Sequence, residues 1–258
     1  MTSANQIIPH ILQGRLAFVT GAGQGNGREI ARGLAEAGAR VIATDMNEGA
    51  VAATADAIRT EGGTAWSFAL DVTQPEACMA LAERVGAEIG QVDLLINNAG
   101  IIIREGSDSP NAARNWQRTL DVNVNGTFNV TQALLPVLRA TRGTILNIAS
   151  IAAYAGQGGS LGYSPSKGAI KMLTQSWAAE LAKDGVRVNA LAPGVIETPM
   201  TTATRDNPEK LEKFMARIPM GRVGQPDELI GPVIFLASSM STYVTGVTLA
   251  VDGGFLAA

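Results

Sequence analysis

Short apolar runs rich in β-branched residues alternate with longer amphipathic stretches along the whole chain. The short runs predict strands at residues 15–20, 40–45, 64–70, 93–99, 143–149, 186–192 and 247–253. The stretches between them predict helices near residues 26–38, 47–61, 75–89, 111–138, 162–183 and 226–238. Alternation of this kind is typical of parallel strands joined by right-handed crossovers. We therefore expect an α/β fold, a doubly wound parallel sheet of about seven strands with helices on both faces.

One segment interrupts this alternation. Residues 199–224 carry clustered charges and three prolines, Pro199, Pro208 and Pro219. An excursion of this length inside an α/β fold is more often a functional loop than a second domain. We expect one domain over residues 1–258, with a substrate lid at 199–218.

Composition excludes several classes of partner. The chain is 46% apolar with a formal net charge of −3 and has no basic run, which argues against nucleic acid. No apolar stretch reaches the roughly 18 residues of a membrane span, and residues 1–14 lack the features of a signal peptide. Cys78 is the one cysteine and His10 the one histidine, too few for a metal site. We expect a cytoplasmic protein without a bound metal, without membrane or nucleic-acid partners.

The stretch "TGAGQGNG" at residues 20–27 leaves the first predicted strand and opens the first predicted helix. Glycine lets a backbone turn tightly and approach a phosphate, and the first N–H groups of a helix attract anions. The G-x-G-x-x-G pattern fails at Asn26, so position in the fold carries the interpretation. We expect Gly21, Gln24, Gly25, Asn26 and Gly27 to hold the pyrophosphate of a dinucleotide.

Asp45 ends the second predicted strand, twenty residues after Gly25. A carboxylate at this strand end can accept hydrogen bonds from the adenosine ribose. It would repel the 2′-phosphate of NADP, and its neighbours Gln24 and Met46 are uncharged. The sequence therefore favours NAD as cofactor.

Tyr163 and Lys167 lie four residues apart, on one face of a predicted helix. Ser150 ends the fifth predicted strand, at the edge where parallel sheets bind ligands. A tyrosine becomes an effective base when a positive neighbour favours its phenolate, and Lys167 can supply that charge. Ser150 can donate a hydrogen bond to an alcohol or ketone oxygen. These residues predict a hydroxyl oxidation or carbonyl reduction.

Tyr163, Lys167, Ser150, the T-G-x-x-x-G-x-G turn and "NNAG" at 97–100 together resemble the short-chain dehydrogenase/reductase family over residues 14–254. The resemblance implies a Rossmann-type fold, commonly as a homotetramer. It implies that Asn123 completes a Ser–Tyr–Lys–Asn tetrad. The residues that it places against the cofactor, besides Tyr163 and Lys167, are Asp71, Val72, Asn98, Ala99, Gly100, Pro193, Gly194, Ile196 and Thr198. Asn26 departs from the family, which usually has Ile or Leu there.

We expect an NAD-dependent oxidoreductase that acts on a small-molecule secondary alcohol or its ketone, with a slight preference for a polyol or sugar-derived substrate. Two alternatives remain: a 3-oxoacyl-carrier-protein reductase, and a catalytically silent NAD-binding regulator. Arg104 lies in the predicted substrate wall and is either solvated or faces a substrate carboxylate.

Overall fold

Seven strands form one parallel sheet in the order β3-β2-β1-β4-β5-β6-β7. The computed structural model describes residues 10–258. The expectation that residues 1–14 are not a signal peptide therefore concerns a segment that lies mostly outside the described residues. The expected doubly wound sheet is confirmed, and its strands follow the predicted runs closely. They are β1 (Leu16–Thr20), β2 (Arg40–Asp45), β3 (Thr64–Ala69), β4 (Leu94–Asn97), β5 (Thr144–Ile148), β6 (Arg187–Pro193) and β7 (Thr248–Val251).

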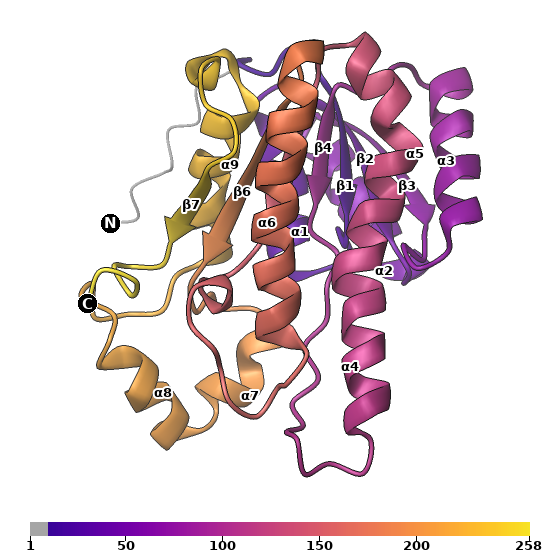
Figure 1. Ribbon diagram of the computed structural model, residues 1–258. Helices are drawn as coiled ribbons and strands as arrows, with labels where there is room; N and C mark the ends of the chain where they lie inside the picture. Colours follow the sequence, from indigo (N-terminus) through magenta and orange to yellow (C-terminus); the bar gives the residue numbers. More distant parts are fainter. Residues whose placement is uncertain (1–9) are drawn as a thin grey trace.

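The helices cover both faces of this sheet (Figure 1). Their bounds are α1 (Gly25–Glu36), α2 (Glu48–Thr60), α3 (Pro75–Glu88), α4 (Ala112–Leu120), α5 (Gly126–Ala140), α6 (Tyr163–Leu181), α7 (Thr202–Arg205), α8 (Pro208–Met215) and α9 (Ile230–Ala237). A π-helical turn, Asp121–Asn125, joins α4 to α5. Among the described residues, no helix combines the length and apolarity that crossing a membrane requires.

The central strand β1 shows why both faces are covered. Successive side chains of a strand point to opposite sides of the sheet. Ala17 and Val19 pack with α1, α2 and α9, whereas Leu16 and Phe18 pack with α3, α5 and α6. All five residues of β1 are buried. The sheet is therefore a rigid central layer whose strands all end at the same edge.

The chain changes direction between β1 and β4, which pair in parallel although two strands separate them in sequence. After β1 the chain builds outward through β2 and β3, then returns to place β4 on the other side of β1. Ligands of open α/β sheets bind at such a reversal, beyond the carboxyl ends of the strands. That edge lies at the bottom of Figure 1, beside α4 and α7.

Candidate active site

The loop between β1 and α1 has the form that a phosphate-binding turn needs. Gly21 and Gly25 have φ of 63° and 53°, the left-handed region that glycine adopts without strain. A Cβ at Gly27 would lie 2.1 Å from the Gly21 carbonyl oxygen, so no other residue fits there. No described side chain caps the first turn of α1 at Gln24, the N-cap residue. The amide groups of this first turn are therefore not taken up by a capping side chain and are open to a ligand.

Thr20 and Asn98 join this loop to the end of β4. The Asn98 side-chain amide donates to the carbonyl oxygens of Thr20 and Gly21, both at 3.0 Å. The Thr20 hydroxyl accepts from the N–H groups of Asn98 and Ala99, also at 3.0 Å. Sequence analysis chose Asn98 and Ala99 but missed Thr20, although the threonine was part of the quoted motif. The two halves of the cleft are held in register by these four bonds.

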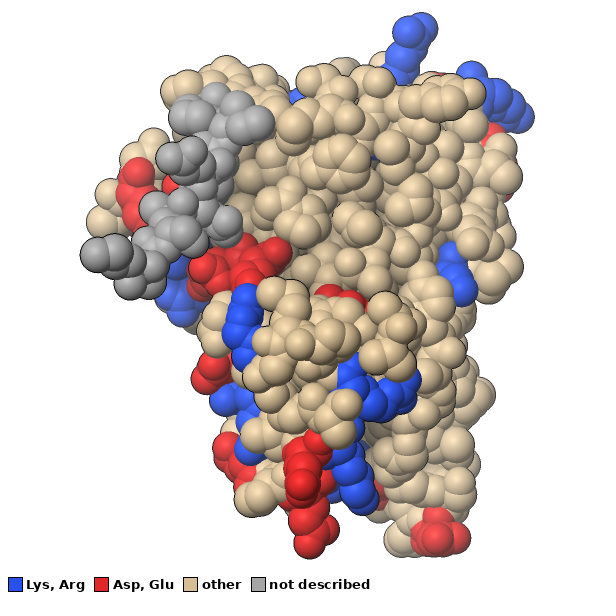
Figure 2. All heavy atoms as spheres, turned by 90° about the vertical axis from the view of Figure 1, so that its left-hand side faces the viewer, with Lys and Arg blue, Asp and Glu red and all other residues tan. Residues whose placement is uncertain are grey.

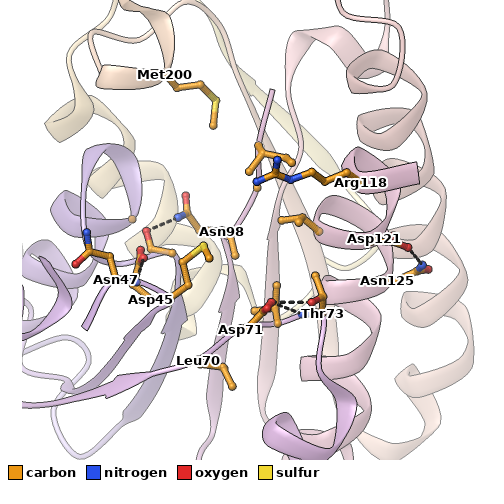
Figure 3. Close-up of a pocket in the computed structure, with 18 of the residues that line it drawn as sticks. Asp45, Asn47, Leu70, Asp71, Thr73, Asn98, Arg118, Asp121, Asn125 and Met200 are labelled. Carbon is orange, nitrogen blue, oxygen red and sulfur yellow. Dashed lines mark hydrogen bonds between the residues drawn. The ribbon is translucent and has the colours of Figure 1, made fainter. Parts of the chain in front are cut away.

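Asp45 is held in place by its own neighbours. Its carboxylate accepts from the N–H groups of Gly23 and Asn47, both at 3.0 Å. Met46 beside it is largely exposed at the rim. On the next strand end, Asp71 accepts from the hydroxyl and N–H of Thr73, and Val72 is buried. Asp45 and Asp71 thus stand at the ends of two adjacent strands (Figure 3).

A cleft of about 1480 Å³ runs along this edge of the sheet. It is lined by most of the residues predicted to bind the cofactor: Gly21, Gln24, Gly25, Asn26, Gly27, Asp45, Met46, Asp71, Val72, Asn98, Ala99, Gly100 and Thr198. Its basic lining residues are Arg114 and Arg118, which sequence analysis missed because nothing in the spacing placed α4 over the cleft. Figure 3 shows Arg118 entering the cleft from the side opposite Asp45.

The segment after β6, which contains four of the predicted cofactor residues, packs partly against the core and partly along the cleft. Pro193 ends β6, and a Cβ at Gly194 would lie 2.8 Å from the Asp252 Cα, so this turn is packed against the chain after β7. The Ile196 side chain is in the apolar core, while its carbonyl oxygen accepts from the Thr201 hydroxyl at 2.6 Å. Thr198 lines the cleft. Of the four predicted residues, Thr198 is the one that lines the cleft.

Ser150, Tyr163 and Lys167 meet beside the cleft. Ser150 follows β5 in extended conformation, and its hydroxyl accepts from the Ala152 N–H at 3.1 Å. Tyr163 is the first residue of α6 and hydrogen-bonds with Ser150. Lys167 lies one turn later, buried, with its ammonium donating to the Ile148 carbonyl oxygen at 2.7 Å and 5.8 Å from the Tyr163 ring centre.

Burial dominates the protonation of this pair. It raises the pKa of the Tyr163 phenol, while the hydrogen bond with Ser150 and the charge of Arg104 act in the opposite direction. Burial lowers the pKa of Lys167 from 10.5 to about 8. The charged lysine is therefore held at a cost in free energy, which a nearby negative group would reduce. A phenolate on Tyr163 would be such a group.

Asn123 occupies the π-helical turn between α4 and α5, a feature that often marks functional sites. Its side-chain amide pairs with both the N–H and the carbonyl of Ile101, at 2.8 and 3.0 Å, and donates to the Ser166 hydroxyl at 2.9 Å. A Cβ at Gly100 would lie 3.3 Å from the Asn123 Oδ1 and 3.6 Å from the Lys167 Nζ. Gly100 lines the cleft, so Asn123 and Lys167 of the predicted tetrad lie directly behind the cleft wall.

This arrangement can carry out proton transfer at an oxygen atom. A hydroxyl donor and a phenol hydrogen-bond each other, and a buried ammonium lies one helical turn away from the phenol. No group of three or more His, Cys, Asp or Glu side chains suited to a metal ion occurs within residues 10–258. The chemistry available is acid–base catalysis beside a cleft built for a dinucleotide.

Arg104 connects this site with the excursion. Its guanidinium donates to the Met200 carbonyl oxygen at 2.8 Å. Its positive charge also lowers the pKa of the Tyr163 phenol, so Arg104 lies near the phenol. Tyr154, in the segment after Ser150, donates its hydroxyl to the Thr248 carbonyl oxygen.

Known proteins are similar in sequence to this chain over almost its whole length. A 2-dehydro-3-deoxy-D-gluconate 5-dehydrogenase of Bacillus subtilis is 45% identical over 95% of this chain and 96% of its own length. A 3-oxoacyl-[acyl-carrier-protein] reductase of Thermotoga maritima is 37% identical over 95% of this chain and 99% of its own.

Solved structures give the same picture. A putative NAD(P)-dependent gluconate 5-dehydrogenase from Beutenbergia cavernae, with bound NADP, superposes with a TM-score of 0.91 at 41% identity, covering 97% of this chain and all of that one. A gluconate 5-dehydrogenase from Burkholderia cenocepacia, with NADP and tartrate, gives 0.91 at 40% identity over 96% and 98%. A 7α-hydroxysteroid dehydrogenase with NADH gives 0.89 at 35% identity over 95% and 96%.

A family model described as enoyl-(acyl carrier protein) reductase matches residues 21–256. Relatives above 30% identity span the chain from end to end, and their fold is the fold described above. The resemblance drawn from Ser150, Tyr163, Lys167 and the glycine turn is thereby confirmed. The chain belongs to the short-chain dehydrogenase/reductase family.

Proposed function

We propose that this protein is an oxidoreductase that transfers a hydride between NAD(H) and a secondary alcohol or ketone of a sugar-derived acid. The observation that carries the proposal is the grouping of Tyr163 with Ser150 and Lys167, where Lys167 and Asn123 adjoin Gly100 in the wall of the dinucleotide cleft. A catalytically silent regulator would have no need of a phenol and a buried ammonium at this point.

The cleft fits a dinucleotide on its own geometry. Gly21, Gly25 and Gly27 of the β1–α1 turn line the cleft, and the lack of a side chain at Gly27 lets the start of α1 pack directly against the Gly21 carbonyl and Asn98. The first N–H groups of α1 therefore lie at the cleft, where a pyrophosphate could bind. When bound, the nicotinamide would supply or accept the hydride. The predicted residues would bind it from Gly21 to Gly27 at the phosphates and from Asp45 and Met46 at the adenosine ribose, with Thr198 at the nicotinamide end.

In alcohol oxidation, Tyr163 would take the hydroxyl proton while the Ser150 hydroxyl donates to the same oxygen as its charge develops. Lys167 would favour the phenolate of Tyr163 by its positive charge. Asn123 would hold the 100–101 backbone against the tetrad through its paired bonds with Ile101. In the reverse direction, Tyr163 would return the proton to the ketone oxygen.

The preference for NAD over NADP rests on Asp45. Its two hydrogen bonds fix the carboxylate at the ribose end of the cleft, where a 2′-phosphate would meet negative charge. The basic lining residues, Arg114 and Arg118, belong to α4, and Figure 3 shows Arg118 on the other side of the cleft. Similar solved structures hold NADP in three cases and NADH in another, so the preference for NAD rests on this chain's own charges.

The preference for an acid as substrate rests on Arg104. Its charge acts on the Tyr163 phenol, and it is tied to Met200 by one backbone bond, which leaves its other N–H groups for a ligand. A guanidinium binds carboxylates in a bidentate fork. Relatives named for gluconate derivatives, and one that holds tartrate, support an acid of this size.

A homotetramer in the cytoplasm completes the proposal. Exposed Trp116, Phe128 and Met172 lie on α4, α5 and α6, and exposed Phe235, Met240 and Tyr243 lie on and after α9. Figure 2 shows that charged side chains gather in the lower part of the face bearing β7 and α8, and few lie in its upper part. Two separate self-complementary faces are what a symmetric tetramer requires.

A substrate panel tests the proposal. Sugar acids, uncharged polyols and an acetoacetyl thioester would be assayed with both cofactors, in both directions. We expect a sugar acid with NAD to give the highest kcat/KM, and Arg104→Gln to raise the KM for acids but not for uncharged polyols. The highest kcat/KM for the thioester with NADPH would instead establish the carrier-protein reductase, and no turnover of any substrate would favour the regulator.

A further inference from the structure

Asn26 lines the cofactor cleft and carries a buried side-chain oxygen, Oδ1, that has no hydrogen-bond partner among the described residues. It is the second residue of α1 and is half-buried. A buried acceptor without a partner lowers the stability of the folded chain. Such a group is retained when it gains a partner that the free protein does not supply.

The loop itself shows which part of a dinucleotide lies near Asn26. A Cβ at Gly23 would lie 2.9 Å from the Asp45 Oδ2, so Gly23 is on the ribose side of the adenosine. A Cβ at Gly25 would lie 3.4 Å from the Thr198 Cβ, and Pro199 is its other neighbour. Gly23 and Gly25 thus face different parts of the cleft wall, Gly23 the Asp45 carboxylate and Gly25 the Thr198 side chain. Asn26 follows Gly25 and belongs to the end where Thr198 lies.

The chemistry of the unpaired atom narrows the partner further. An amide oxygen accepts hydrogen bonds, and a pyrophosphate has no hydrogen to donate at neutral pH. The donors at that end of a dinucleotide are the nicotinamide carboxamide and the hydroxyls of its ribose. The terminal torsion of an asparagine is broad, so its amide can turn to present the oxygen to either.

We propose that the Asn26 side-chain amide is a cofactor-positioning group that accepts a hydrogen bond from the nicotinamide riboside half of the dinucleotide. The loop would otherwise bind the cofactor through its backbone alone. The unpartnered oxygen of Asn26 then lowers the stability of the cofactor-free protein, and the hydrogen bond that it gains on binding raises the affinity for the cofactor. This inference rests on the proposed use of a nicotinamide dinucleotide.

Asn26→Leu tests it, because leucine keeps the branched skeleton and removes the acceptor. Isothermal titration would measure Kd for NADH, ADP-ribose and ADP, and thermal unfolding would be followed without ligand. We expect NADH to bind about five- to tenfold more weakly and ADP to bind within about twofold of the parent. We expect the unfolding midpoint of the cofactor-free protein to rise by about 2–4 °C.

The ADP-ribose arm identifies the donor: weakening with ADP-ribose indicates a ribose hydroxyl, and weakening with NADH alone indicates the carboxamide. Gln91→Leu, an exposed amide before β4 at the opposite edge of the sheet, is the matched control and should change neither Kd nor midpoint. Unchanged NADH affinity in Asn26→Leu overturns the proposal, as does equal weakening of ADP. Weaker binding with a lower midpoint overturns it too, because the loop would then be damaged. A parent protein that binds neither NADH nor NADPH would refute the proposed function itself.

Discussion

Tyr163 combines a raised pKa with a hydrogen-bonding partner and a cation one turn away. Removing its hydroxyl as Tyr163→Phe leaves the ring in place and takes away the proton acceptor. We expect kcat to fall by about three orders of magnitude or more while the Kd for NADH stays within about twofold. Steady-state kinetics and NADH fluorescence check both. Tyr243→Phe, on the fully exposed Tyr243, is the control; near-parental turnover by Tyr163→Phe would exclude this residue as the base.

Lys167 makes stability depend on pH. Its pKa is about 8 in the folded protein against 10.5 as reference, so between these values the unfolded chain binds a proton that the folded chain does not. Stability relative to Lys167→Met, which has no titrating group, should therefore rise with pH, by up to about 1.4 kcal/mol per unit between pH 8 and 10. Urea unfolding of both proteins across pH 6–10 measures the difference. A flat difference would contradict the buried, strained ammonium.

Asp45 should control the choice of cofactor. We expect the parent to favour NAD over NADP by at least tenfold in kcat/KM, about 1.4 kcal/mol. The pair Asp45→Ala with Met46→Arg removes the repulsion and supplies a cation, and should narrow or invert the ratio. Equal use of both cofactors by the parent would show that Asp45 does not discriminate between them.

The sequence alone predicted which residues lie at the ends of the strands, because seven apolar runs define where each strand stops. Contacts between segments that are far apart in the sequence could not be predicted in this way. Thr20 became important only once β4 was known to lie beside β1, and Arg118 only once α4 was seen over the cleft. That the Ile196 side chain packs in the core while Thr198 lines the cleft also follows only from the folded chain, and the prediction that Ile196 contacts the cofactor stays a prediction. The unpaired Oδ1 of Asn26 is invisible in a sequence, since partnership depends on what surrounds an atom.

At the scale of helices and strands, the structure differs in two places from the elements predicted from the sequence. The stretch predicted as one helix at 111–138 is divided by the π-helical turn Asp121–Asn125, whose polar residues gave no sign of a break. The excursion after β6 contains α7 and α8, and no residue of α8 is buried. Its two ends are fixed: Thr201 bonds to Ile196 near one end, and Ile218 packs with Ile151 and Phe255 at the other.

Helix α8 has no buried residue, and only its last two residues, Phe214 and Met215, pack against the fixed end, so the part of the segment before them should open easily. We expect the amides of residues 202–213 to exchange rapidly in the free protein and to become protected when NADH and a substrate analogue bind. Hydrogen–deuterium exchange with mass spectrometry measures this, and the buried strand β1 serves as the slow internal reference. Slow exchange that ligand does not alter would identify the segment as an interface instead of a lid.

For the whole molecule, the exposed apolar residues of α4, α5 and α6 predict self-association. Met172 on α6 is 56% exposed and Met79 on α3 is 50% exposed, which makes a matched pair. Met172→Lys should place a charge within the proposed interface and lower the mass from tetramer toward dimer, and Met79→Lys should leave it unchanged. Light scattering after gel filtration gives the masses. A monomeric parent, or equal effects of both variants, would contradict the tetramer.

The reversal of strand order between β1 and β4 also marks a place where the chain could be cut into two fragments for protein engineering. Cutting the backbone at Gly90–Gln91 would leave β1–β3 with the glycine turn on one fragment and β4–β7 with the tetrad on the other. The seam between them includes the β1–β4 ladder, the bonds of Thr20 with Asn98, the Arg15–Asp93 ion pair and the packing of α1 on α9 and of α3 on α5. Because the cleft takes its lining from both pieces, a dinucleotide would bridge them. Co-expressed fragments of this enzyme would form a split sensor whose reassembly reports the concentration of its own cofactor.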